Sequence, residues 1–466
     1  MRDIQPPKPQ RRIYPLDPRD LTEEQIAVAF AMTSRRPEPF DEIAKLVSEA
    51  KAANFHERWV LNYGHSSVAE HAIIHMAVEN ISRLACDTLE DNRLGSYTEK
   101  SSRYQIIDQN AFHTPKELLN TPLQNMYTST CEYLFREYHI MVEELSTYLK
   151  QKMLKGKEEK DGSFKLRIRR EAIDSCRFIL PAATLTNVGV TMNARSLEHA
   201  ILKLLSSEII EEKEIGQEIK EQGLNITPTL IKYAENNKYL SDTRKLRNIP
   251  NSYSLNKNQN TNVSTKLIHF DPLGEDRVLA AIFYKRFPQP YELIWNQISN
   301  FTQTEKSILF DEIFGGLGPH DIPLRELENT DYLFDMVMDY GAYREYKRHR
   351  MQTYIPQPLT VDLGFVLPPL IKECGLGNRF LKAMQVVAET FQKINNHSPY
   401  LAEYLVTHAH NRRLLCKINL RECYHLLKLR TQPQAHFTIQ EVGFKILNEI
   451  KKVHPLLSKY LQLRAE

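Results

Sequence analysis

Residues 63–71, YGHSSVAEH, place two histidines and two serines next to a glycine, a combination suited to a bound polar ligand. Small hydroxyl side chains beside glycine allow a ligand close to the backbone, and imidazoles both donate and accept hydrogen bonds near neutral pH. The same spacing is typical of a helix start, with Ser66 or Ser67 as the N-cap and Glu70 completing a capping box. Spacing alone favours the helix start over the ligand site.

Residues 93–104, RLGSYTEKSSRY, interleave hydroxyl side chains with basic and acidic ones. Arginine can hold a phosphate through two parallel hydrogen bonds, while serine and glutamate can reach a sugar or a base. The segment therefore predicts a nucleotide site, and the alternative is a solvent-exposed strand edge. Residues 101–107, SSRYQII, which overlap its end, mix polar and β-favouring side chains and predict a strand.

Residues 344–350, REYKRHR, hold five potential cations. Such charges repel each other unless an anion neutralises them, which favours a phosphate site. In extended backbone Arg348 and Arg350 would point one way and His349 the other, so the triplet could face two ligands. The alternatives are an exposed basic helix end and an RNA-binding patch, whose affinity would fall steeply with added salt.

Residues 419–430, NLRECYHLLKLR, combine an amide with several cationic side chains. On a helix, Asn419 and Arg430 are eleven residues apart (430 − 419), about three turns, and share one face. Such a face can hold the edge of a flavin and a pyrimidine. It can also make surface salt bridges only.

The elements that must position these segments are predicted to be mostly helical. An apolar stripe at helical spacing predicts one helix, formed by Leu197, Ile201, Leu204, Leu205 and Ile209. Residues 173–180 predict another helix, which should end before Pro181 because proline cannot continue a helix. With the strand expected at 101–107, the pattern predicts an α+β fold.

Two pairs of motifs indicate an internal duplication. Asp17-Pro18 and Asp271-Pro272 are 254 residues apart (271 − 17), and the Pro-x-Pro motifs at 37–39 and 288–290 are 251 apart (288 − 37). A nearly constant offset between dissimilar flanks is typical of a repeated unit.

A polar segment at residues 248–266 separates the two copies. It is rich in Asn, Ser and Lys, and it has too few large apolar residues to offset the entropy of ordering. We therefore predict a first repeat at residues 1–247, a linker at 248–266 and a second repeat at 267–466.

Composition narrows the class of protein. A chain of 466 residues is too long for one ordinary core, and its net charge of +3 does not require a broad nucleic-acid-binding face. The six cysteines are scattered, with no C-x-x-C pair, which argues against a zinc site and a disulfide framework. The N-terminal residues lack the apolar core of a secretory signal, and no apolar run is long enough to cross a bilayer. We expect a soluble cytoplasmic protein without a metal site.

Taken in order, these motifs resemble those of the flavin-dependent thymidylate synthases. The resemblance rests on Gly-His-Ser-Ser-x-x-Glu-His, an Arg-His-Arg triplet followed seven residues later by Ser, Ser-Arg-Tyr, Leu-Pro, Asn-x-Arg and Leu-Arg. It covers nearly the whole chain, once per half, apart from the linker. It implies an α+β fold of two tandem copies, each helix-rich with a small, mostly antiparallel sheet.

In the first half, the resemblance makes His71 a flavin contact. It assigns dUMP binding to Glu99, Ser101, Ser102, Arg103 and Arg177. The triplet is degraded here, because residues 91–93 read Asp-Asn-Arg, and Leu204 stands at the position of a later catalytic arginine.

In the second half the triplet is intact. The flavin-binding residues implied here are Arg348, His349, Arg350, Asn419, Arg421 and His425. Arg348 is also implied in dUMP binding, and Arg430, with Arg103, is the candidate catalytic guanidinium. Pro358 stands at the signature serine, and Glu403 replaces the equivalent of Arg177.

The resemblance implies FAD-dependent reductive methylation of dUMP to dTMP, with methylenetetrahydrofolate as carbon donor and NADPH as reductant. Family members build each site between subunits, so we expect the two repeats to pair as an intrachain pseudo-dimer with a composite site; a homodimer of such chains is compatible with this. The alternative is a non-catalytic duplicate that still binds flavin or nucleotide. Neither a nucleic acid nor a membrane is expected as a partner.

Overall fold

The computed structural model describes residues 12–461 and 463, apart from residues 13, 17, 35, 63–64 and 245–264. Three features of the sequence therefore fall outside the described residues: Asp17 of the first Asp-Pro pair, Tyr63-Gly64, and the predicted linker from 248 to 264. Among the described residues, no helix is both long enough and apolar enough to cross a membrane.

The chain forms two compact units that do not follow the predicted repeat boundaries. The first unit contains residues 1–79, 88–99 and 187–249, and the second contains 80–87, 100–186 and 250–466. The second unit therefore combines the whole second repeat with a large part of the first. Each unit is described separately below.

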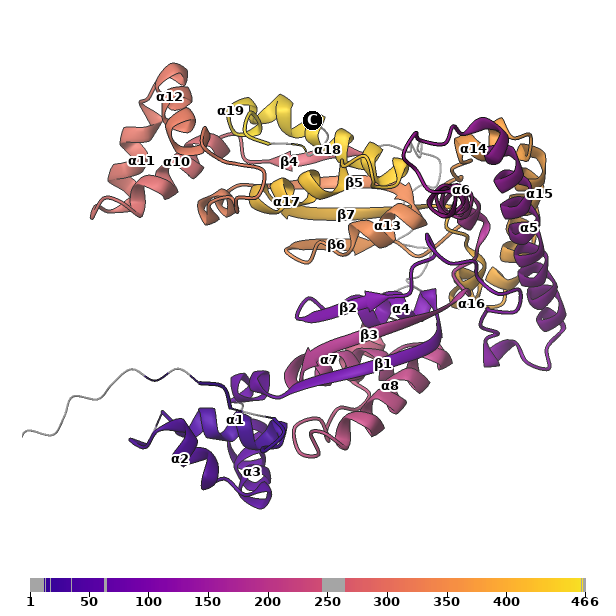
Figure 1. Cartoon of the computed structure of the whole chain (residues 1–466). Coiled ribbons are helices and arrows are strands. Elements are labelled where there is room, and N and C mark those ends of the chain that lie inside the picture. Colours follow the sequence, from indigo (N-terminus) through magenta and orange to yellow (C-terminus); the bar gives the residue numbers. More distant parts are fainter. Residues whose placement is uncertain are drawn as a thin grey trace, which may run out of the picture. The chain divides into compact units, whose positions relative to one another are not determined.

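The first unit is built from helices and a three-stranded sheet of order β1-β3-β2 (Figure 1). Its elements are α1 (Glu23–Met32), α2 (Phe40–Lys45), α3 (Glu49–Phe55), η1 (His56–Asn62), η2 (Ser66–His71), β1 (Ile73–Ser82), α4 (Arg83–Glu90), β2 (Gly95–Glu99), β3 (Leu185–Asn193), α7 (Ala194–Leu205), α8 (Ile210–Leu224) and α9 (Lys238–Arg244). Three of them, β1, α4 and β3, include residues of the second unit. The apolar stripe predicted at 197, 201, 204, 205 and 209 lies on α7 as far as Leu205, and α7 buries Leu197, Ile201 and Leu204. Ile209 lies beyond this helix, at the N-cap of α8.

The second unit holds a four-stranded sheet of order β4-β5-β7-β6, on which α17 and α18 pack (Figure 1). Its elements are η3 (Lys116–Leu118), α5 (Pro122–Lys152), α6 (Asp161–Cys176), η4 (Arg177–Ile179), β4 (Lys266–Phe270), α10 (Gly274–Tyr284), α11 (Tyr291–Ser299), α12 (Gln303–Phe314), η7 (Arg325–Asn329), β5 (Asp331–Asp339), α13 (Tyr340–Tyr346), β6 (Gln352–Pro356), α14 (Pro369–Glu373), α15 (Gly377–Asn395), α16 (Pro399–Ala402), η8 (Glu403–Leu405), β7 (Asn411–Asn419), α17 (Leu420–Arg430), α18 (Phe437–Val453) and α19 (Pro455–Ser458).

The two sheets repeat the same strand pairing. Gly95 pairs with Met192 across β2 and β3, and Gln352 pairs with Ile418 across β6 and β7, both antiparallel. The offsets are 257 on one strand (352 − 95) and 226 on the other (418 − 192), and they hold along both five-residue ladders. The predicted fold class, tandem helix-rich copies with small antiparallel sheets, is thus confirmed.

Inside the second unit, the two copies pair reciprocally through their backbones. Ala182 N–H donates to Val406 at 2.8 Å, and the positions 226 residues away return the bond, since His408 N–H donates to Leu180 at 3.0 Å. Ala183 pairs with residue 404, and residue 409 with residue 178, in the same reciprocal way. Mutual bonds between equivalent positions are the signature of a two-fold contact.

Three local predictions need correction or adjustment. Residues 101–107 form a turn and irregular backbone rather than a strand, and the strand of this region is β2, which ends at Glu99. Neither Ser66 nor Ser67 caps η2, because His65 is at the N-cap position and makes no side-chain cap bond. The helix before Pro181 does end, although its last turn, η4, is a 3-10 helix.

Candidate functional site

Three arginines from distant parts of the chain meet in the second compact unit: Arg103, Arg177 and Arg430. Arg103 lies on the turn that follows β2, Arg177 starts η4 where α6 ends, and Arg430 is the last residue of α17. Together with the carboxylates Asp174 and Glu345 they form what we term the arginine cluster. Its first two arginines belong to the first repeat and the third to the second.

The two carboxylates bind the arginines from different elements. Asp174 on α6 accepts hydrogen bonds from Arg103 at 2.8 and 3.0 Å, and its Oδ1 lies 2.9 Å from Arg177 Nε. Glu345 on α13 accepts a hydrogen bond from Arg430 Nη1 at 3.3 Å. Its other oxygen lies 3.8 Å from Arg177 Nη2 and 4.0 Å from Arg103 Nη1.

The arginine cluster carries one more positive than negative charge, since three guanidinium groups face two carboxylates. Burial alone would raise the pKa of Asp174, but the cations of Arg177 and Arg103 outweigh burial and hold that pKa below its usual value. Burial lowers the pKa of Arg430, which nonetheless stays charged because a guanidinium does not lose its proton in proteins. A half-buried cluster with excess positive charge is suited to binding an anion.

Of the predicted serines, Ser102 is the one that contacts a guanidinium of the arginine cluster. Its hydroxyl accepts a hydrogen bond from Arg177 Nη1 at 3.3 Å. The hydroxyl of Ser101 instead accepts the backbone N–H of Arg103 at 3.2 Å, which fixes the turn. Ser101 therefore positions Arg103.

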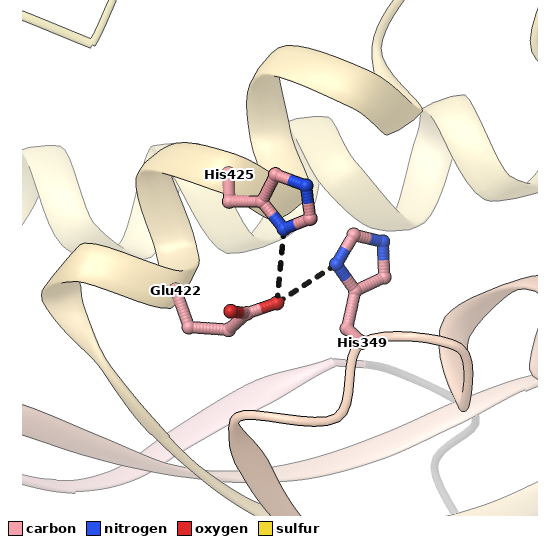
Figure 2. A group of neighbouring side chains, drawn as sticks. All are labelled: His349, Glu422 and His425. Atoms are coloured by element: carbon pink, nitrogen blue, oxygen red, sulfur yellow. Dashed lines mark hydrogen bonds and ion pairs between the residues drawn. The ribbon is translucent and has the colours of Figure 1, made fainter. Parts of the chain in front are cut away.

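A hydrogen-bonded chain in the second repeat holds Arg430 in place. Arg430 Nε donates to His349 Nε2 at 3.0 Å, and His349 Nδ1 bonds Glu422 Oε1 at 2.9 Å. Because Nε2 must accept, His349 is neutral and carries its proton on Nδ1. Burial lowers the pKa of this histidine, in agreement with the neutral form. His425 bonds the same Glu422 oxygen at 3.3 Å (Figure 2).

His349, Glu422 and His425 also bring three potential metal ligands within 4.8 Å of one another (Figure 2). A metal on Nδ1 of His349 would move the imidazole proton to Nε2, where it would oppose the N–H of Arg430. The position of Arg430 therefore favours the hydrogen-bonded arrangement.

Two other cations of the basic segment, Lys347 and Arg344, are neutralised by the protein itself. Asp87 lies 2.8 Å from Lys347 Nζ and 3.1 Å from Arg344 Nη1, and all three side chains are buried. The charge density of residues 344–350 is therefore no evidence for a phosphate at these two positions. Around His349, Arg348 and Arg350 are exposed, which matches the predicted alternation.

Two cavities of the second unit border predicted residues. A cavity of about 350 Å³ is lined by Asn419, Arg421 and His425, with Met351 among the other lining residues. Asn419 caps α17 because its side-chain oxygen accepts the backbone N–H of Glu422, so this oxygen already has a partner within the protein. A larger cavity of about 980 Å³ adjoins the arginine cluster through Arg103 and Asp174.

His71 and Glu99 belong to the first unit. His71 lines a cavity of about 490 Å³ together with His65, Ser67 and Trp59, and its ring packs 4.9 Å from that of Phe30. This aromatic pocket suits a planar ligand. Glu99 is the last residue of β2.

Sequence reasoning missed the carboxylates that organise the site. Asp174 precedes Arg177 by one helical turn, and Glu422 precedes His425 by the same spacing, so the local signal was available. Glu345 and Asp87 carried no such signal, because their partners come from other elements of the fold.

We predict that Glu422→Ala will lower the free energy of unfolding by roughly 1.5–3 kcal/mol, because a charged hydrogen bond to buried His349 is lost. Burial would raise the pKa of Glu422, but hydrogen bonds from His349 and His425 bring it to about 2. The stabilisation should thus be complete above the usual carboxyl range and disappear as pH falls toward that value.

Urea unfolding at several pH values measures this effect. Glu422→Gln is the matched control, because its amide oxygen can still accept from His349, and it should retain most of the stability. Equal losses in both variants would contradict a role for Glu422 in fixing the imidazole.

Two segments of the chain match one known protein family. Residues 19–229 and 278–456 match the Thy1 family, described as thymidylate synthase complementing protein. The chain belongs to the Thy1 family. The match falls once in each repeat, so this member carries the family's sequence twice, as the resemblance in the motifs implied.

Some relatives of this Thy1 chain match most of its length, and others match less than half of it. A UPF0159 protein of Chlamydia muridarum is 28% identical over 429 residues, covering 88% of this chain and 81% of the relative. A flavin-dependent thymidylate synthase of Clostridium tetani is 26% identical over 216 residues, covering 45% of this chain and 82% of the relative. A crystal structure of the UMP/dUMP methylase PolB from Streptomyces cacaoi bound with 5-Br dUMP matches 43% of this chain and 95% of that one, with 13% identity and a TM-score of 0.34.

Proposed function

We propose that this Thy1 chain is a FAD-dependent thymidylate synthase, which methylates dUMP to dTMP with methylenetetrahydrofolate as carbon donor and NADPH as reductant. The observation that carries the proposal is the arginine cluster. Arg103 and Arg177 of the first repeat share the carboxylate of Glu345 with Arg430 of the second, within one compact unit. The reciprocal backbone bonds between the repeats support an intrachain pseudo-dimer with a composite site.

Each repeat lacks what the other supplies, which supports one site per chain. In the first repeat, Asp91 replaces the triplet arginine and forms a salt bridge with Lys203, next to Leu204. In the second repeat, Glu403 replaces Arg177 and accepts the backbone N–H of Leu359 at 3.0 Å. Asp91 and Glu403 thus have structural partners in their own repeats, which supports one complete site per chain.

For dUMP, the arginine cluster provides both phosphate and base contacts. Arg103 and Arg177 are suited to the phosphate, with the Ser102 hydroxyl beside them. Arg430 is suited to the pyrimidine, because a fixed guanidinium stabilises the charge that develops on the ring during attack. Arg348, exposed on the turn that follows α13, is a further candidate contact.

For the flavin, the residues present fit in part. The 350 Å³ cavity offers the imidazole of His425 and the guanidinium of Arg421, although Arg421 is held 2.7 Å from Glu328. His349 bonds the same Glu422 oxygen as His425, and His71 stands in its aromatic pocket in the first unit. Bound FAD would carry the reducing equivalents from NADPH to the methylene group.

The alternative, a duplicate that binds flavin or nucleotide without turnover, is favoured by Glu345. This carboxylate lies where an anion would meet the three arginines.

The proposal is tested by expressing this chain in a thymidine-requiring bacterial strain and measuring growth without added thymidine. We expect growth, a yellow purified protein, and dUMP-dependent oxidation of its reduced flavin. Bound flavin without complementation would support the non-catalytic alternative. A colourless protein that cannot be reconstituted with FAD would exclude both.

A further inference from the structure

A polar stripe on α6 leads from the arginine cluster into the cavity of about 980 Å³. Its members recur at helical spacing on one face of the helix: Ser163, Arg167, Arg170, Asp174 and, at the end of the helix, Arg177. All but Arg177 line the cavity. Because a helix rises 1.5 Å per residue, Arg170 lies about 10 Å along the axis from Arg177. The cavity thus continues the nucleotide site at its phosphate end.

The charges in this cavity are only partly paired. Among the residues that the structure describes, its charged lining side chains are Arg103, Arg167, Arg169, Arg170, Glu159, Glu171 and Asp174. Arg103 is paired with Asp174 at 2.8 Å, and Arg167 with Glu159 at 2.7 Å. Arg169 and Arg170 remain against Glu171, an excess of one positive charge (2 − 1). Such an excess beside a phosphate site favours a further anionic group.

Arg170 is held close to the part of the site that is suited to the phosphate of dUMP. Its guanidinium lies over the ring of Tyr104, 4.6 Å from the centroid, and Tyr104 directly follows Arg103. Stacking uses the face of a guanidinium and leaves the N–H groups at its edge for hydrogen bonds. Within the described part of the chain, Arg170 makes no hydrogen bond and no ion pair. Its N–H groups can therefore bind an anion in the cavity.

His436 adds a neutral donor to the cavity wall. Its side chain is only 5% exposed, and its ring stacks on Phe178 with centroids 5.0 Å apart. Nδ1 accepts the backbone N–H of Thr438 at 3.3 Å, so the proton is on Nε2. Burial lowers the pKa of His436 to about 3, in agreement with the neutral form. Nε2 has no hydrogen-bond partner among the described residues, and a buried donor of this kind needs an acceptor.

We propose that this cavity binds the second phosphate group of a nucleoside 5′-diphosphate, so that dUDP binds to this chain in competition with dUMP. The proposal rests on the proposed function, which places the first phosphate at Arg103 and Arg177. The second phosphate then extends away from the pyrimidine, toward the N–H groups of Arg170 and His436. It adds about one negative charge, which the excess positive charge of the cavity balances. Contacts of Arg430 with the pyrimidine are the same for both nucleotides.

Calorimetric titration of the full chain at pH 8 tests this, with dUMP and dUDP as ligands and no divalent cation present. Wild-type protein should bind dUDP roughly 10-fold more tightly than dUMP, because the second phosphate gains at least one charge-assisted hydrogen bond. Saturating dUDP should abolish the heat of dUMP binding. Arg170→Gln should reduce the preference for dUDP to about 2-fold or less, since a guanidinium at the second phosphate is lost.

The matched control is Arg136→Gln. Arg136 lies on α5 of the same compact unit and stacks over Tyr133 at 5.4 Å, as Arg170 stacks over Tyr104. It is exposed and does not line the cavity, and its substitution changes the net charge by the same amount. This variant should keep the full preference for dUDP.

Wild-type protein that binds dUDP no more tightly than dUMP overturns the proposal, and so does an Arg170→Gln variant that keeps the full preference. The wild-type comparison decides the matter even if the variant does not fold. Where dUMP binds but dUDP is not preferred, this proposal fails and the proposed function stands.

Inorganic pyrophosphate and phosphate decide the case in which neither nucleotide binds, which would refute the proposed function. Tighter binding of pyrophosphate than of phosphate in wild type, and not in Arg170→Gln, would still support a site for a second phosphate in this cavity. Equal binding of the two anions in wild type would refute that site as well.

Discussion

Arg430→Ala is expected to reduce dUMP methylation by at least about 100-fold while the purified protein keeps its flavin. Arg430 is held by His349 at 3.0 Å and by Glu345 at 3.3 Å, so its guanidinium is fixed before a substrate binds. Removing one preorganised group that stabilises developing charge costs roughly 10²- to 10³-fold in kcat. Steady-state turnover and the flavin absorbance of the same preparation measure the two effects.

Arg413→Ala is the matched control, because Arg413 pairs with Asp335 on the same sheet and lies outside the arginine cluster. It should leave turnover unchanged. Unaltered activity in Arg430→Ala would refute the assigned role. Loss of flavin together with activity, at an unchanged melting temperature, would make Arg430 a flavin contact instead.

The sequence predicted the arginines but not how they are held. Arg103, Arg177 and Arg430 follow from motif order and the family resemblance, whereas Glu345 comes from a segment interpreted as a basic patch. Its role depends on three residues brought together by tertiary packing, and one sequence carries no record of such contacts. For the same reason the sequence did not predict that Asp87 pairs with Lys347 and Arg344, two cations of the segment in which a phosphate site was expected.

The fold shows a similar division. The duplication and the α7 stripe are local or periodic signals, and both were predicted correctly. The strand predicted at 101–107 was wrong because polar and β-favouring side chains also suit a turn that carries binding groups. Arg103 needs this turn to reach Asp174. The reciprocal pairing at 178–183 uses backbone groups, which leave no side-chain pattern in the sequence.

Asp87→Asn is expected to destabilise the second compact unit by roughly 3–5 kcal/mol, because it removes the carboxylate shared by buried cations. Asp87 bonds Lys347 at 2.8 Å and Arg344 at 3.1 Å, and Arg412 lies 3.6 Å away. Thermal and urea unfolding of the full chain measure the loss. Asp331→Asn, whose exposed salt bridge with Lys417 is worth at most about 1 kcal/mol, is the control.

The pH dependence of this loss separates charge from packing. Burial alone would raise the pKa of Asp87, but Lys347, Arg344 and Arg412 together hold it below the usual carboxyl value. A depressed folded-state pKa means that the stabilisation is complete above about pH 4, the value in the unfolded chain, and is lost as pH falls through the folded-state pKa. Wild type and Asp87→Asn should therefore differ most near neutral pH and converge in acid. A difference that stays constant from pH 7 to strongly acidic pH would mean that the amide disrupts packing, and that the ion network contributes little.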